Sequence, residues 1–129
     1  MAQKEPKRLT ELEAIVMNAV WDLSPATVRD VQEHLKETRP MAYNTVLTVM
    51  RILRDKGFLR SHREGRVDVY EPAVSREHVG RRSLSELLER FFSGSAEALV
   101  SQLLELEDLK ADDVRAIRRE VDKELRRRA

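Results

Sequence analysis

Residues 42–72 read AYNTVLTVMRILRDKGFLRSHREGRVDVYEP, a run that combines two kinds of apolar spacing. Four apolar side chains between residues 43 and 55 recur three and four positions apart, which predicts one buried face of a helix. They are Val46, Val49, Met50 and Leu53. Gly57 follows where a left-handed C-terminal cap is needed. Residues 58–63 and 66–72 partly alternate, with Glu64-Gly65 between them as a turn signal, so the run predicts a helix followed directly by a β-hairpin.

Two further helices are predicted before this run. Thr10 and Glu13 have the spacing of a capping box, and apolar residues then recur at helical spacing as far as Ser24-Pro25. Thr27 can cap a second, shorter helix that ends at about Lys36. Residues 1–74 therefore contain three helices and a hairpin, which is the element order of a winged helix-turn-helix domain.

Residues 75–129 have a helical pattern and no strand signal. Ser83 and Glu86 form another capping-box pattern, and a last helix is expected after Asp108, with Asp112-Asp113 in its first turn. Short helices cannot readily bury the many apolar residues of this segment on one another, so we expect them to pack against a second copy of the chain. The predicted dimerisation residues are Leu84, Leu87, Leu88, Phe91, Leu99, Leu103, Val114, Ile117 and Val121. The predicted fold is mainly α with a small β-hairpin wing: a winged helix-turn-helix in residues 1–74 and an all-helical dimerisation domain in residues 75–129.

Composition excludes several classes of function. The chain of 129 residues has no cysteine, so it has no disulfide, thiolate metal site or cysteine nucleophile. The histidines at positions 34, 62 and 78 lack ligand spacing, no residue set suggests an enzyme, and we expect no metal or other cofactor. No apolar run approaches the ~20 residues that span a bilayer, which predicts a cytoplasmic protein without membrane insertion.

The positive charge is concentrated although the whole chain carries only +1. Residues 39–66 hold seven basic and two acidic residues, a net charge of +5. The basic ones are Arg39, Arg51, Arg54, Lys56, Arg60, Arg63 and Arg66. A local excess of this kind is typical of a surface that meets nucleic acid.

The polar face of the third predicted helix carries side chains that can read bases. Asn44, Thr48 and Arg51 lie opposite its apolar face, and Thr45 and Leu47 lie at the flanks. Asparagine pairs with adenine, arginine pairs with guanine, and threonine offers both a hydroxyl and a methyl group. On the helical wheel Tyr43 lies nearer the core, where its hydroxyl can still reach a phosphate.

Arg63 and Arg66 flank the hairpin turn and are expected to contact phosphates or the minor groove. Two alternatives remain open at this point. The polar helix face can be an ordinary solvated surface, and winged helices also serve as protein-interaction modules without specific DNA binding.

The sequence resembles the penicillinase-repressor family of winged-helix regulators, the BlaI/MecI/CopY family. The resemblance rests on LTELEAIVMNAVW, TVRDVQEHL, AYNTVLTVMRILRDKGFL, VYEPAVS and LVSQLLELEDLKADDVRAIRREVD, and covers about residues 9 to 125. It implies a homodimer that represses transcription from a palindromic DNA operator. It assigns Tyr43, Asn44, Thr45, Thr48 and Arg51 to the recognition helix, and residues 82–125 to the dimer interface.

Two departures limit the resemblance. Family members that are cut by a membrane sensor protease are cleaved at an Asn-Phe bond, and the matching position here is Gln102-Leu103. This difference argues against such a protease as a partner. The copper-responsive branch ends in a cysteine cluster, which this chain lacks.

Overall fold

The structure is a computed structural model and describes residues 8–129. It divides into two compact units, Met1–Ser83 and Leu84–Ala129. The assignment of residues 1–74 and 75–129 to separate functions remains a prediction.

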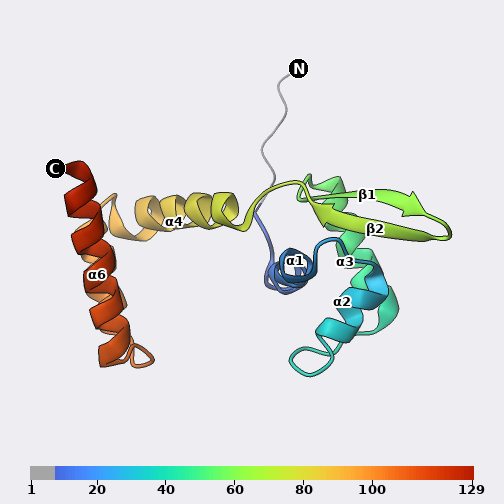
Figure 1. Ribbon diagram of the computed structural model, residues 1–129, viewed down its shortest axis with the longest axis horizontal. Helices are drawn as coiled ribbons and strands as arrows, with labels where there is room; N and C mark the ends of the chain where they lie inside the picture. The colour runs from blue at the N-terminus through green and yellow to red at the C-terminus, as the bar shows by residue number, and fades with distance from the viewer. Residues whose placement is uncertain (1–7) are drawn as a thin grey trace, which may run out of the picture. The chain divides into compact units, whose positions relative to one another are not determined.

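The first unit is a three-helix domain with a hairpin (Figure 1). Helices α1 (Glu11–Leu23), α2 (Val28–His34) and α3 (Tyr43–Asp55) surround a core to which the hairpin also contributes. The predicted capping box at Thr10 and the predicted cap at Thr27 are both present, since the two hydroxyls accept hydrogen bonds from the Glu13 and Asp30 amides. The most fully buried side chains include Val16, Met17, Val20, Val31, Val46, Met50, Leu53 and Tyr70. Helix α2 ends at His34, two residues before the predicted end.

The hairpin consists of β1 (Leu59–Glu64) and β2 (Val67–Pro72), paired antiparallel from Leu59 opposite Pro72 to Glu64 opposite Val67. The two predicted glycines have left-handed backbones, with φ of +91° at Gly57 and +62° at Gly65. An additional bridge was not predicted. Ala26 and Tyr70 exchange two backbone hydrogen bonds of 2.9 and 2.8 Å, which join the segment before α2 to the base of the wing.

Helix α4 corrects one prediction. It runs without interruption over Arg76–Phe92, so Ser83 lies inside the helix and does not cap it. The Ser75 hydroxyl accepts a hydrogen bond of 3.0 Å from the His78 amide instead. Once the helix has begun at Arg76, extending it through Ser83 is easier than breaking it and starting again.

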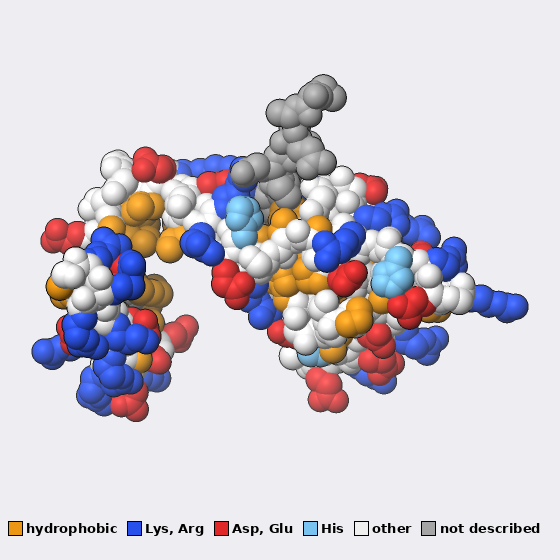
Figure 2. All heavy atoms as spheres, turned by 45° about the horizontal axis from the view of Figure 1, so that its top comes forward, with side chains coloured by type: hydrophobic (Ala, Val, Ile, Leu, Met, Phe, Trp, Pro, Cys, Tyr) orange, Lys and Arg blue, Asp and Glu red, His pale blue; other side chains and the backbone are white. Residues whose placement is uncertain are grey.

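The second unit contains the end of α4, then α5 (Ala96–Leu104) and α6 (Ala111–Arg128). Asp112 and Asp113 lie in the first turn of α6, as predicted. No described residue of α4, α5 or α6 is buried, and Phe91 is 68% exposed. Figure 2 shows apolar side chains open on these helices. Within residues 8–129, no helix has both the length and the apolar character needed to cross a membrane.

Candidate nucleic-acid interface

Helix α3 separates an apolar face from a polar one. Val46, Met50 and Leu53 are fully buried in the first unit, as their spacing predicted. The polar face carries Asn44, Thr45, Thr48 and Arg51, all of which are exposed. The buried face fixes the rotation of the helix about its axis, so the polar side chains form one continuous outward surface.

Tyr43 is 45% exposed, although its position on the helical wheel is nearer the core than those of Asn44, Thr48 and Arg51. It is the first residue of α3, and the buried positions of the helix begin only at Val46. Tyr43 and Asn44 are thus both accessible at the start of α3.

The N-terminus of α3 differs from the N-termini of α1 and α2. The Thr10 and Thr27 hydroxyl oxygens accept hydrogen bonds from amides in the first turns of those helices, whereas Ala42 at the start of α3 makes no side-chain cap. The first turn of α3 also has no acidic residue. The amide groups there keep the partial positive charge that favours an anion such as a phosphate.

The two arginines at the wing tip are exposed but have different surroundings. Arg63 donates from Nη1 to the Arg66 carbonyl oxygen at 2.9 Å, and its Nε lies 3.4 Å from Asp68 Oδ1. For Arg66 no side-chain partner is found in the part of the chain that the structure describes. Figure 2 shows basic side chains projecting from the far end of the hairpin. Arg63 thus braces the turn, and Arg66 is free to reach a ligand.

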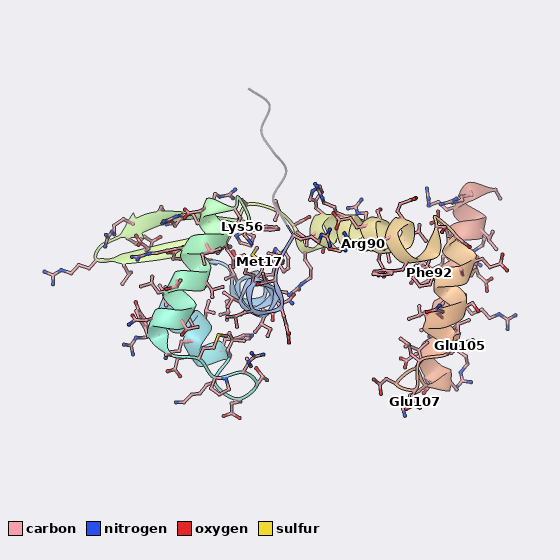
Figure 3. The ribbon with its side chains drawn as sticks, turned by 180° about the vertical axis from the view of Figure 1, so that it is seen from behind. Met17, Lys56, Arg90, Phe92, Glu105 and Glu107 are labelled. Carbon is pink, nitrogen blue, oxygen red and sulfur yellow. The ribbon has the colours of Figure 1, made fainter. Side chains whose placement is uncertain are left out.

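Three of the basic residues of 39–66 are paired with side chains of other elements in the first unit. Lys56 lies at the end of α3 (Figure 3) and is bound to Glu13. Arg60 Nε lies 3.5 Å from Glu71 Oε1 across the hairpin. Arg54 Nη1 donates to the Ser61 hydroxyl at 3.4 Å. The sequence could not show these pairings, because their partners come from other elements.

The buried Glu13 forms an ion pair with the partly exposed Lys56. The Lys56 ammonium donates to the two Glu13 carboxylate oxygens at 2.8 and 2.9 Å, and the Thr10 amide donates to Oε1 at 2.9 Å. Burial by itself raises the pKa of Glu13, but the hydrogen bonds from Lys56 and Thr10 outweigh it and hold the pKa below its ordinary value. This charged pair ties the start of α1 to the end of α3.

The wing is attached to α3 through the backbone. The Phe58 amide donates to the Leu53 carbonyl at 2.9 Å, and the Ala73 amide donates to the Phe58 carbonyl at 2.8 Å. These bonds hold both ends of the hairpin at the C-terminus of α3. Three packed helices, an exposed polar third helix and a hairpin held beside it define a winged helix-turn-helix protein.

Comparisons with known proteins agree with this class. The family model described as penicillinase repressor matches residues 9–123, and the chain belongs to that family of transcriptional regulators. It is 28% identical to the penicillinase repressor of Bacillus licheniformis, over 86% of this chain and 87% of the relative. It is 35% identical to the transcriptional regulator BlaI of Mycobacterium tuberculosis, over 87% of this chain and 81% of the relative.

A solved structure supports the fold of the first unit. The solution structure of the DNA binding domain of the repressor BlaI matches with a TM-score of 0.51 and 32% identity, over 58% of this chain and 90% of that domain. The fold predicted from the sequence, a winged helix-turn-helix followed by a helical segment, is confirmed.

Proposed function

We propose that the protein is a transcriptional repressor that binds a palindromic operator as a homodimer, with α3 in the major groove and the wing on the DNA backbone. The observation that carries the proposal is the exposed face of α3. Asn44, Thr48 and Arg51 stand outward from a helix whose opposite side is fully buried. A helix held this rigidly can present base-reading groups with a defined register.

Each end of the interface has its own role in the proposal. In the proposal, the uncapped N-terminus of α3 and the Tyr43 hydroxyl bind phosphates beside the groove. Arg66 supplies the wing contact, because it has no competing partner among the described side chains. Thr45 and Thr48 offer methyl and hydroxyl groups to base edges. Phosphate contacts position the domain, and the α3 side chains choose the sequence.

The dimer is supported by the lack of a core in the second unit. The nine apolar residues predicted for dimerisation lie on helices without a buried residue, and several are among the most exposed apolar side chains of the described chain. A second copy is the partner that can cover them symmetrically. Two recognition helices would then meet half-sites about 34–36 Å apart.

Repression by occupancy requires no cofactor, and it places the protein in the cytoplasm with the DNA that it covers. Cleavage by a membrane sensor protease is not part of the proposal. Gln102 and Leu103 lie inside α5 and do not match the cleaved pair of the family.

The test is fluorescence anisotropy of labelled duplexes from upstream of the protein's own gene, at about 150 mM salt with excess scrambled competitor. Specific DNA should bind about 10³-fold more tightly than the competitor. The Arg51→Ala variant should bind the operator with about 1–3 kcal/mol less binding free energy. It should also lose its base preference at one operator position. Arg119→Ala on α6 removes one exposed arginine outside the proposed interface and serves as the control.

Binding no tighter than the competitor would overturn the proposal and favour a winged-helix protein-interaction module. A weak salt dependence would lead to the same conclusion. DNA affinity should fall between 50 and 200 mM salt with a logarithmic slope of about 0.9 per phosphate contact.

A further inference from the structure

Helix α6 carries an open apolar stripe along most of its length. Val114, Ile117, Val121 and Leu125 recur three or four positions apart, so they lie on one side of the helix. Val114 is 40% exposed, Val121 is 52% exposed and Leu125 is 63% exposed. No described residue of α6 is buried, so the second unit by itself leaves this stripe open to solvent.

The charges of the same segment alternate in blocks along the chain. Residues 105–113 hold five acidic residues and one basic residue, and residues 115–119 hold three basic residues and no acidic one. Residues 120–124 hold three acidic residues and one basic residue, and residues 126–128 are all arginine. The two inner blocks meet between positions 119 and 120, which is also the midpoint of the apolar stripe.

This pattern distinguishes the two ways in which α6 can pair with α6 of a second copy. Parallel pairing would place each block beside the same block of the other copy, so like charges would meet at every level. Antiparallel pairing about the midpoint places each block beside a block of opposite sign. It also sets the helix dipoles in opposite directions and closes the stripe on itself, with Val114 opposite Leu125 and Ile117 opposite Val121.

Arg118 and Asp122 are the charged pair closest to this midpoint on one edge of the stripe. Both are exposed, and no partner for either is found among residues 8–129. A two-fold axis between antiparallel helices brings the same edge of both helices together. Arg118 of one copy then lies level, within about 1.5 Å along the axis, with Asp122 of the partner subunit. Helix axes about 8–10 Å apart leave these side chains within reach of each other.

Other charged side chains of α6 are already paired within the helix. These pairs are Asp112 with Arg115, Glu120 with Lys123, and Glu124 with Arg127 and Arg128. Arg119 has no described partner either, but it lies on the far side of the helix from the stripe. Arg118 and Asp122 are therefore the unpaired charges that a second α6 would meet.

We propose that α6 packs antiparallel against α6 of a second copy, and that Arg118 of each copy forms an ion pair with Asp122 of the partner subunit. This inference rests on the homodimer of the proposed function and names one of its interfaces. The apolar stripe supplies the buried area. Exposed ion pairs add little affinity, so Arg118 and Asp122 act mainly by selecting the orientation of the two helices.

The first experiment mixes two full-length variants, Arg118→Asp and Asp122→Arg, and measures their dimers by native mass spectrometry. One variant carries two acidic side chains at these positions and the other carries two basic ones, so each homodimer brings like charges together. We expect each variant alone to dimerise about tenfold more weakly than the unaltered protein. The mixed dimer should exceed about 80% of all dimers, because opposite charges meet only between the two variants.

Arg119→Asp is the matched control, since it makes the same charge change one position along α6, away from the stripe. Alone it should dimerise like the unaltered protein. Mixed with Asp122→Arg, it should give about half mixed dimers, although the two chains differ in net charge by the same amount.

The second experiment reports the orientation of the two helices directly. The chain has no cysteine, so a single thiol can be placed by Val114→Cys or by Leu125→Cys. In the antiparallel dimer these two positions face each other, and an equal mixture of the variants in glutathione buffer should form mainly the mixed disulfide. Parallel helices would instead link each variant to itself.

Two results would overturn the antiparallel α6 pair. One is a mixture of Arg118→Asp and Asp122→Arg with about the statistical half of mixed dimers, and the other is self-linking of the two cysteine variants. Either result in a protein that still dimerises would leave the homodimer standing and move its interface to other helices. A monomeric unaltered protein would instead refute the homodimer of the proposed function, and the α6 pair with it.

Discussion

Replacing Glu13 by glutamine tests whether an ion pair joins the two helices on which the recognition surface depends. The Glu13 side chain is 8% exposed and that of Lys56 is 24% exposed, and the Lys56 ammonium reaches both Glu13 carboxylate oxygens. Glutamine keeps an oxygen that can accept from the Thr10 amide, so the substitution removes the charge and spares the cap. The change therefore isolates the contact between α1 and the end of α3.

The expected loss of stability follows from how deeply the Glu13 and Lys56 side chains are buried. Breaking a fully buried pair costs about 3–5 kcal/mol, because the remaining charge is left without a partner. Lys56 can be partly rehydrated, so we expect Glu13→Gln to lower the free energy of unfolding by about 1–3 kcal/mol. For a unit of this size, each kcal/mol corresponds to roughly 4–8 °C in Tm.

The effect depends on pH in a defined direction. Because the pKa of Glu13 is lower in the folded protein than in the unfolded chain, the pair stabilises the fold above the ordinary glutamate pKa of about 4.3. This contribution is lost as the pH falls through the lowered pKa. The difference between Glu13→Gln and the unaltered protein should be complete at pH 7 and should shrink in acid.

Urea denaturation followed by circular dichroism, at one fixed protein concentration, measures these differences. Glu11→Gln is the control, since Glu11 is an exposed carboxylate in the same first turn. A double-mutant cycle with Lys56→Met should give a coupling energy of about 1–2 kcal/mol at pH 7. A coupling below about 0.5 kcal/mol, or equal destabilisation by the two glutamine variants, would refute the reasoning.

Three other outcomes are expected. Tyr70→Phe should leave stability unchanged or raise it by up to about 1 kcal/mol, because the buried Tyr70 hydroxyl has no hydrogen-bond partner among the described residues; a clear loss in urea denaturation would contradict this. Arg66→Ala should reduce the salt slope of DNA binding by about 0.9, and Arg63→Ala should change it less, because Arg63 is held by Asp68 and the Arg66 carbonyl; equal slopes in anisotropy titrations would show that both contact phosphate. Phe91→Ser should shift the protein toward monomer in sedimentation experiments without lowering the stability of the first unit, since Phe91 is exposed in the single chain; an unchanged dimer would move the interface elsewhere.

Much of the first unit was predictable because its signals are local. Thr10 and Thr27 lie three residues from the carboxylates that complete their capping boxes, and Gly65 lies inside the turn that it permits. The spacing of Val46, Val49, Met50 and Leu53 predicted which side of α3 is buried, and hence which side is polar and exposed. Ser83 shows the limit of such signals, because the same pattern occurs inside a helix that has already begun.

Side-chain pairing depends on residues that lie far apart in the sequence. Lys56 belonged to a basic run in the sequence, yet its partner Glu13 lies 43 residues away and takes its charge out of the proposed interface. The sequence likewise did not predict the contacts of Arg76, because its partners Trp21 and Asp22 lie beside it only in the folded chain.

Helix periodicity, caps and turns depend on residues within one or two turns of the chain, so the amino-acid order alone was enough to predict the elements and the recognition face. Which arginine is free and which is held depends on the distance between side chains from different elements. Packing sets that distance, and no local pattern encodes it. The exposed polar face of α3 was therefore predictable from the sequence. The hydrogen bond of Arg63 to the hairpin turn, the ion pair of Glu13 and the contacts of Arg76 with α1 exist only in the folded chain.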